Sequence, residues 1–286
     1  MPTAPEATAE LLAHDWTGAC RRAAEGLRDV MTDHPTSTER VIETGEIGGG
    51  GDRTLVIDAA AEDAVFAELE KLHDSGARFT AVSEERGEVD FGNPDHLVVI
   101  DPIDGSMNAM RGLGHHALSI AVATGPTMGD VVFGYVYDFG PGEEWRASRG
   151  MGAFLNDEPL VDPPPERRRP DGRLELVAIE SADPKWLAAS SDALTAVTGR
   201  IRAMGTIAVS LCQVAATRVD GMVTLWRCRA VDAAAAQLIV RESGGLVAFP
   251  AMEEPLGAPL DLLPHSPVVA ARTPEALAEL ATVPSR

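Results

Sequence analysis

The feature that most constrains this chain is a short apolar run that ends in two closely spaced carboxylates. Leu97–Ile100 is apolar throughout, which is typical of a fully buried strand, and Asp101 follows it directly. Pro102 has no backbone N–H and stops the strand, so Asp104 lies on the same tight turn as Asp101. Two like charges about 4 Å apart repel by on the order of 4 kcal/mol near a protein surface, so the turn requires a protonated acid or a bound cation.

The residues after the second carboxylate favour a phosphate beside that cation. Gly105 allows close approach of the backbone, and Ser106 is a residue type found where helices begin, where free N–H groups bind anions. Mg²⁺ prefers oxygen ligands, keeps water and often shares its site with a substrate phosphate. The segment therefore predicts a corner for a metal ion and a phosphate. An ordinary strand-to-helix turn with a capping acid is the alternative that spacing alone leaves open.

The turn also resembles a known motif. Residues 101–106 match the Asp-Pro-Ile-Asp-Gly-Thr sequence of the inositol monophosphatase superfamily, with Ser106 in place of threonine. The members of this superfamily are Mg²⁺-dependent, Li⁺-sensitive phosphatases. Other segments match it in order along the chain: Gly48–Asp52 with Thr54, Asp58 and Glu62, then Ser83–Gly87, Gly205–Ala208 with Leu211-Cys212, and Val231–Ala236 with Glu242–Gly245. Several motifs in the right order make a chance resemblance to this superfamily unlikely.

The resemblance implies a set of metal ligands. Two to three Mg²⁺ ions would be bound by Glu84, Asp101, the carbonyl of Ile103, Asp104 and Asp232. Two of these acids, and Asp58 beside them, have simpler explanations as well. Glu84 fits a solvated loop, Asp232 suits the dipole of the helix that it begins, and Asp58, near the third ion, could cap the next helix.

The resemblance also implies catalytic and substrate-binding groups. The catalytic residues would be Asp58, Ser106 and Glu84, with Ser106 hydrogen-bonded to Asp58 and orienting a metal-activated water. The substrate phosphate would be held by Gly105, Ser106, Gly205 and Thr206. Arg200 and Arg202 precede Gly205 and could reach the same phosphate, although a charged loop explains them equally well.

Within the superfamily, the pattern resembles archaeal-type enzymes, which are described as acting on both inositol monophosphate and fructose 1,6-bisphosphate. Ala109 and Val231 stand where animal-type enzymes have Phe and Trp, and Leu225 stands where those enzymes place a Glu that contacts inositol hydroxyls. We therefore expect a phosphatase of sugar or polyol phosphates with broad specificity. The alternatives are a 3′(2′),5′-bisphosphate nucleotidase, disfavoured by an aromatic content of 5%, and a non-catalytic relative that binds metal or sugar phosphate.

Composition narrows the functional class. The net charge of −20 argues against nucleic-acid binding, which needs a basic surface. No apolar run reaches the roughly 18 residues that cross a membrane, and the first residues lack the pattern of a signal peptide. Three widely spaced cysteines fit neither a disulfide framework nor a zinc site. We therefore expect a cytoplasmic enzyme with a small phosphate ester as substrate and, by family resemblance, a homodimer.

Periodicity and turn residues predict an α+β or α/β chain, and the resemblance implies a layered α-β-α-β-α sandwich. The expected helices are Pro5–Met31, Ala59–His73, Ala188–Val197 and Ala208–Arg218. The expected strands are Thr54–Ile57, Phe79–Val82, Leu97–Ile100, Ala117–Thr124, Val131–Tyr137, Glu143–Ala147, Gly152–Asn156 and Leu174–Ile179. The proline-rich and arginine-rich segment 163–170 is the expected linker between an N-terminal half, 1–160, with most metal ligands and a C-terminal half, 161–286, with Asp232.

Overall fold

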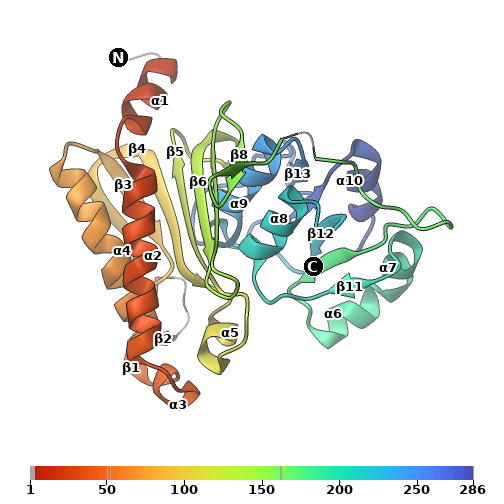
Figure 1. Ribbon diagram of the computed structural model, residues 1–286, viewed down its shortest axis with the longest axis horizontal. Helices are drawn as coiled ribbons and strands as arrows, with labels where there is room; N and C mark the ends of the chain where they lie inside the picture. Colours follow the sequence, from red (N-terminus) through yellow and green to blue (C-terminus); the bar gives the residue numbers. More distant parts are fainter. Residues whose placement is uncertain (1–3, 50, 52, 162, 286) are drawn as a thin grey trace.

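The two larger sheets of this protein are each covered by helices on both faces, and apolar side chains are buried between the layers. The computed structural model describes residues 4–49, 51, 53–161 and 163–285, and it stacks helix and sheet layers in the order α-β-α-β-α (Figure 1). The layered sandwich expected from the sequence is thereby confirmed. Within the described residues no helix has the length and apolar character that a bilayer crossing requires.

The first helical layer consists of α2 (Trp16–Asp33) and α4 (Val56–Asp74), which pack on each other and on the larger sheet. The prediction of one helix over 5–31 was wrong, because α1 (Ala4–Leu12) ends before α2 begins. Asp15 causes the break, since its side chain accepts the N–H of Gly18 at 2.9 Å and caps the new helix. Short elements follow at α3 (Ser37–Arg40), β1 (Glu43–Ile47) and β2 (Arg53–Leu55).

The larger sheet has seven strands in the order β3-β4-β5-β6-β7-β8-β9. They are β3 (Phe79–Ser83), β4 (Gly87–Asp104), β5 (Ala117–Ala123), β6 (Val131–Asp138), β7 (Glu143–Ser148), β8 (Ala153–Leu155) and β9 (Glu158–Pro159). The sequence predicted only Leu97–Ile100 of β4, because the part before Val98 is half-buried or exposed whereas Val98–Asp104 is buried throughout. Pro102 does not stop the strand as expected: β4 continues to Asp104, with an irregularity in its pairing to β5 between Asp101 and Asp104. This buried end, followed by α5 (Ser106–Arg111), carries the acidic turn.

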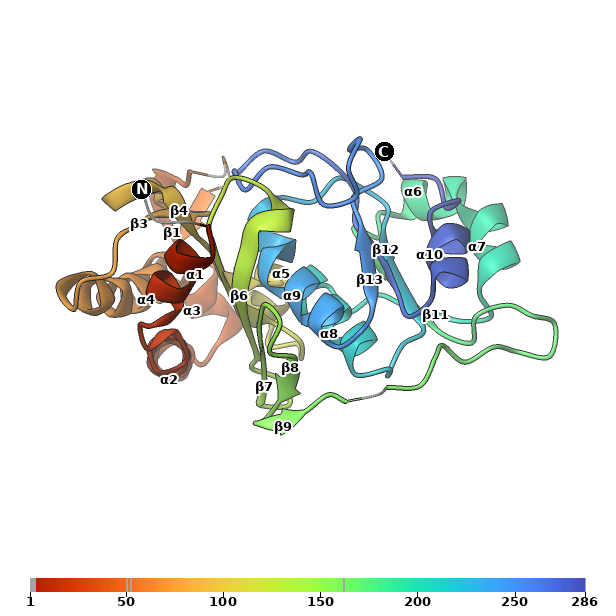
Figure 2. The ribbon, with the colours of Figure 1, turned by 90° about the horizontal axis from the view of Figure 1, so that it is seen from above.

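The middle layer is formed by α8 (Ile207–Ala215) and α9 (Ala230–Glu242), which lie between the two sheets (Figure 2). Both helices are buried along almost their whole length, which their small and apolar side chains permit. Gly134 of β6 shows how close the packing is, since a Cβ there would lie 2.5 Å from the carbonyl oxygen of Ala235. The strand and helix that carry the acidic residues are therefore held against one common core.

The smaller sheet has five strands in the order β11-β10-β12-β14-β13. They are β10 (Val177–Glu180), β11 (Ile201–Arg202), β12 (Gly221–Thr224), β13 (Leu246–Ala248) and β14 (Val269–Ala271). The outer helices are α6 (Pro184–Ala189), α7 (Ser191–Val197) and α10 (Pro274–Leu280), and the 3₁₀ turn η1 (Met128–Asp130) precedes β6.

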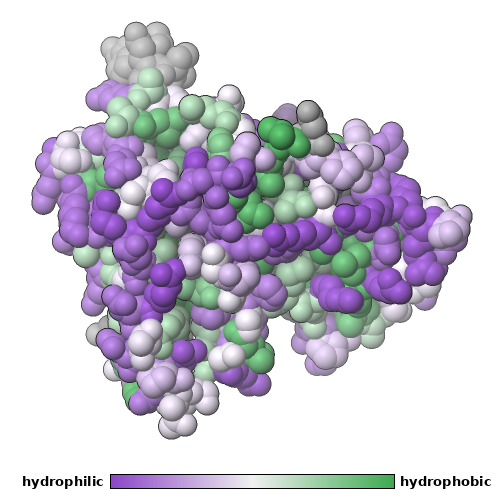
Figure 3. All heavy atoms as spheres, viewed as in Figure 1, coloured by the Kyte–Doolittle hydropathy of each residue, from purple (hydrophilic) through white to green (hydrophobic). Residues whose placement is uncertain are grey.

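The chain between β9 and β10 runs along the outside of the molecule and joins the two sheets (Figure 2). The boundary expected at residue 160 falls in this segment and stays a prediction. Residues from both sides of it belong to the same central apolar core. The face seen in Figure 3 is mostly hydrophilic, in keeping with the high net charge.

Candidate metal centre and substrate cavity

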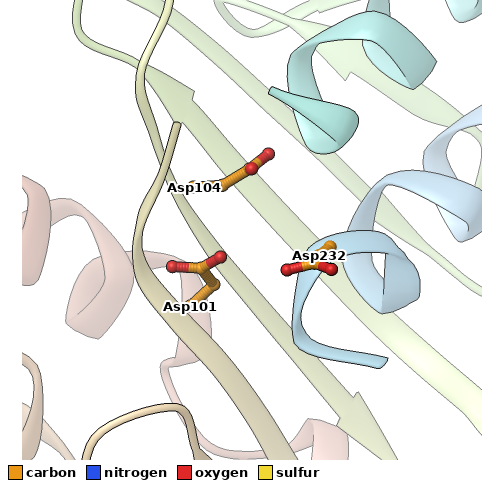
Figure 4. Close-up of side chains that lie close together, drawn as sticks. All are labelled: Asp101, Asp104 and Asp232. Carbon is orange, nitrogen blue, oxygen red and sulfur yellow. The ribbon is translucent and has the colours of Figure 1, made fainter. Parts of the chain in front are cut away.

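Three aspartates from distant parts of the chain meet between the sheets. Asp101 and Asp104 end β4, and Asp232 lies in the first turn of α9 (Figure 4). One carboxylate oxygen from each lies within 4.8 Å of the others. All three residues are buried, at 2%, 7% and 8% exposure respectively. Three acids so close together and so far from water are costly as anions unless a cation balances them.

The electrostatics of the cluster point the same way. Burial, followed by the nearby charges of Glu84, Asp104 and Asp232, raises the pKa of Asp101 well above its ordinary value. Burial and then Asp232 raise the pKa of Asp104 to about 8. A hard cation would reverse both shifts, and an all-oxygen donor set is the kind that Mg²⁺ takes. The residues present therefore fit a magnesium centre.

Local hydrogen bonds fix the orientation of each carboxylate. The N–H of Ile103 donates to Oδ1 of Asp101 at 2.9 Å, which shapes the turn after the strand. The N–H of Ala208 donates to Oδ2 of Asp104 at 2.7 Å, and the hydroxyl of Thr206 donates to the same oxygen. The N–H of Arg229 donates to Oδ2 of Asp232 at 3.0 Å, so this aspartate also caps α9.

Glu84 joins the cluster through an arginine that the sequence analysis missed. Glu84 lies in the turn after β3, and its Oε1 accepts Nη1 of Arg229 at 2.6 Å. Nη2 of Arg229 also lies 3.3 Å from Oδ1 of Asp232. Burial raises the pKa of Glu84 to about 7, although Arg229 opposes the shift. Arg229 thus supplies positive charge within the acidic cluster.

A cavity of about 290 Å³ opens on the side of the cluster nearer α4. Its lining residues are Leu55, Asp58, Glu84, Glu85, Asp101, Pro102, Ile103, Ser106 and Met110. Burial and then Glu85 raise the pKa of Asp58 to about 6. Asp58 and Ser106 line the same cavity, but the bond found for Asp58 is from the N–H of Leu55 at 3.3 Å. Ser106 and Asp58 both belong to the described part of the chain, and the expected hydrogen bond between them is not formed there.

A larger cavity of about 750 Å³ lies on the other side, and Ser106 lines both. Besides Asp104, Asp232 and Arg229, it includes Gly105, Gly205, Thr206 and residues of the segment 180–186. Gly105 has a φ of +87°, and a Cβ there would lie 2.9 Å from the carbonyl oxygen of Gly205. Glycine is thus required where the two predicted phosphate-binding segments meet. Gly50 and Asp52, from the first matched motif, lie outside the described residues.

A second missed residue is Glu180, which ends β10 and lines the larger cavity. Its carboxylate accepts the N–H of Met204 at 2.9 Å and of Gly205 at 3.0 Å, and it also accepts the hydroxyl of Ser210. Burial raises the pKa of Glu180 to about 7. The sequence contains a signal for this residue: the apolar run 176–179 directly precedes Glu180, just as Leu97–Ile100 directly precede Asp101.

The structure does not bring Arg200 and Arg202 to the acidic cluster. Arg202 and Ile201 form β11, the edge strand of the smaller sheet, and both arginines are exposed. Arg200 lies 3.8 Å from Glu175 and lines a separate surface cavity beside α7. Leu225 also differs from expectation, because it is fully buried in the core beneath α10 and does not line either cavity at the cluster.

Comparisons with known proteins agree with this geometry. A model of the inositol monophosphatase family matches residues 10–284. A Methanothermobacter thermautotrophicus protein named fructose-1,6-bisphosphatase/inositol-1-monophosphatase is 31% identical over 243 residues, 81% of this chain and 83% of that protein. A Haemophilus influenzae protein named Nus factor SuhB is 35% identical over 203 residues, 70% of this chain and 72% of that protein.

A solved structure described as an inositol monophosphatase–fructose 1,6-bisphosphatase has the same fold. It superposes with a TM-score of 0.77 at 23% identity, covering 94% of this chain and 99% of that chain. Fold, acidic cluster and family match agree along nearly the whole sequence. The chain therefore belongs to the inositol monophosphatase family and is a phosphatase.

Proposed function

We propose that this protein is a Mg²⁺-dependent phosphatase that hydrolyses sugar or polyol phosphate monoesters, including inositol 1-phosphate and fructose 1,6-bisphosphate. The observation that carries the proposal is the cluster of Asp101, Asp104 and Asp232, within 4.8 Å of one another beside a cavity of about 750 Å³. The name of the archaeal relative, which combines the two activities, supports this choice of substrates.

The family resemblance and the positions of the acids support one assignment of ligands. Glu84, Asp101 and the carbonyl of Ile103 would hold one ion, and Asp101, Asp104 and Asp232 a second. A third, weaker site would lie near Glu84 and Asp58, which line the smaller cavity together. Bound Mg²⁺ lowers the pKa of a water ligand and neutralises charge that develops on the phosphate and on the leaving oxygen.

The protein's own groups would orient the reactants. We assign the N–H groups at Gly105 and Ser106 to the phosphate, because both residues line the larger cavity next to Asp104. Asp58 and Ser106 line the smaller cavity, where they would orient the attacking water. Thr206 acts through Asp104, whose orientation its hydroxyl fixes.

A substrate panel tests the proposal. Phosphate release would be measured from inositol 1-phosphate, fructose 1,6-bisphosphate and 3′-phosphoadenosine 5′-phosphate, with Mg²⁺ and with excess chelator. We expect turnover of both sugar phosphates only with Mg²⁺. A preference for the nucleotide would identify a bisphosphate nucleotidase instead, and binding without turnover would identify a non-catalytic relative. The homodimeric state and the cytoplasmic location stay predictions, the first of which light scattering can test.

A further inference from the structure

The tryptophans of this chain fall into two groups with different surroundings. Trp16 and Trp145 are buried in the core, at 2% and 0% exposure. Trp186 and Trp226 instead form a stacked pair, with ring centroids 4.8 Å apart and planes 7° from parallel. Trp226 is 39% exposed, and Trp186 is half-buried. Large aromatic side chains left near the surface are commonly used for binding.

Trp186 lies at the wall of the larger cavity. It lines this cavity together with Asp104, Ser106 and Asp232, whereas Trp226, which stacks on it, does not belong to the lining. The cavity thus has an acidic end, suited to metal and phosphate, and an aromatic wall. A pocket with a few polar groups at one place and an apolar surface elsewhere is the usual form of a small-molecule site.

The position of Trp186 is fixed relative to the acidic end. Glu180, six residues earlier, is tied to the backbone of Met204 and Gly205, which approaches Gly105. Asp183 caps α6 by accepting the N–H of Lys185 at 2.7 Å, and Trp186 lies in the first turn of this helix. The stack on Trp226 restricts the orientation of the ring further. A rigid wall of this kind adds binding energy at a low cost in side-chain entropy.

We infer that Trp186 is a specificity residue, and that it receives the flat apolar face of a ring in the substrate while the phosphate lies at the acidic end. The inference rests on the proposed phosphatase function and adds a substrate class to it. Phosphate esters with a ring, either a sugar or polyol ring or a nucleobase, can cover the indole face. Acyclic esters such as glycerol 2-phosphate have no such face and gain little from it.

The test compares ring-bearing and acyclic substrates in tryptophan variants of the full chain. Trp186→Ala should lower kcat/KM for inositol 1-phosphate and fructose 1,6-bisphosphate by roughly threefold to tenfold, mainly through KM, as expected for loss of an aromatic contact. The same variant should change kcat/KM for glycerol 2-phosphate by less than about twofold. Trp186→Phe should recover most of the loss, and Trp226→Ala should show a smaller loss of the same pattern.

The control is Leu263→Ala, which removes another exposed apolar side chain, 63% exposed, that lines neither cavity at the cluster. It should leave all substrates unchanged. Equal losses on ring and acyclic substrates in Trp186→Ala would overturn the inference, as would no loss on either. Comparison with 3′-phosphoadenosine 5′-phosphate shows whether the ring is a sugar or a base, since Trp186→Ala should lower kcat/KM most for the substrate whose ring covers the indole.

A fluorescence titration separates failure of this inference from failure of the proposed function. With Mg²⁺ and inorganic phosphate present, myo-inositol should change the emission of the wild-type protein and of Trp226→Phe, but not that of Trp186→Phe. Glycerol should change none of them. If no substrate is hydrolysed but myo-inositol still acts through Trp186, the phosphatase proposal fails and the ring site stands. Adenosine is titrated in the same way as a ring of the other class. If neither myo-inositol nor adenosine changes the emission, the ring site is refuted whatever the activity.

Discussion

Replacing Asp104 by asparagine separates the structural role of this side chain from its role in metal binding. The hydroxyl of Thr206 and the N–H of Ala208 both donate to Oδ2, so the amide oxygen of an asparagine can accept both bonds. The other oxygen becomes an NH₂ group, which donates to the neighbouring carboxylates instead of repelling them. We therefore expect Asp104→Asn to fold, to be more stable than the wild type without metal, and to lose most of its turnover.

The size of the stability difference follows from the pKa of Asp104, which is about 8 in the folded protein compared with about 4 for an aspartate in an unfolded chain. The folded state therefore binds the Asp104 proton more tightly than the unfolded chain does. The contribution of this protonation to the free energy of unfolding is complete below about pH 4 and is lost as the pH rises through about 8. The loss is at most about 1.4 kcal/mol per pH unit. Relaxation around the cluster reduces it, so we expect Asp104→Asn to gain about 2 kcal/mol near pH 8 in chelator.

Urea unfolding in chelator between about pH 5 and pH 8 measures this difference, and thermal unfolding with and without Mg²⁺ measures the response to metal. The control is Asp220→Asn. Both oxygens of Asp220 accept backbone N–H bonds, from Arg167 at 2.7 Å and from Leu176 at 2.8 Å, so an amide there must lose one. The control should be destabilised at every pH and keep its Mg²⁺ response. A metal-free Asp104→Asn that is less stable than the wild type at pH 8 would refute the reasoning.

Three further outcomes follow from the same geometry. Arg229→Gln should bind Mg²⁺ more tightly in a calorimetric titration, because no guanidinium competes for Glu84, and weaker binding would contradict this. Glu180→Gln loses one of the two backbone N–H bonds to Met204 and Gly205, so KM for inositol 1-phosphate should rise severalfold with kcat nearly unchanged. Because burial raises the pKa of Glu180 to about 7, the wild type should lose stability as the pH rises through about 7, and Glu180→Gln should not show this loss. The same pH dependence of stability in both proteins would count against a buried, titrating Glu180. Finally, kcat/KM for inositol 1-phosphate and fructose 1,6-bisphosphate should agree within about tenfold, because Leu225 is buried in the core and its position presents no acid to the cavity that could select hydroxyls; a hundredfold preference for a nucleotide over both would move the protein to another substrate class.

The acidic end of the site was predictable because its residues lie in short motifs with strong local signals. An apolar strand that ends in Asp101 and Asp104 forces two carboxylates onto one turn, and the family resemblance supplied Glu84 and Asp232. The layered fold followed from the same resemblance, with local errors where a single side chain decides the boundary. Asp15 breaks the first predicted helix in this way by capping the next one.

The remainder of the site depends on contacts between distant segments, which no local pattern encodes. Arg229 bonds to Glu84 across 145 positions of the chain, and Trp186 acquires its place at the cavity from a stack with Trp226. Arg200 and Arg202 were assigned to the phosphate because they are close in sequence to Gly205, but the short edge strand β11 carries them away from it. The low aromatic content of 5% likewise gave no information on where the aromatic residues lie.

If buried carboxylates hold Mg²⁺ for phosphate ester hydrolysis, activity must be lost with the metal and return with it. Protein stripped of metal by exhaustive dialysis against chelator would be assayed for phosphate release from inositol 1-phosphate and fructose 1,6-bisphosphate, before and after Mg²⁺ is restored. We expect no release before and full release after, with most of the turnover of Asp104→Asn absent in both conditions. Full activity in the stripped protein would contradict it.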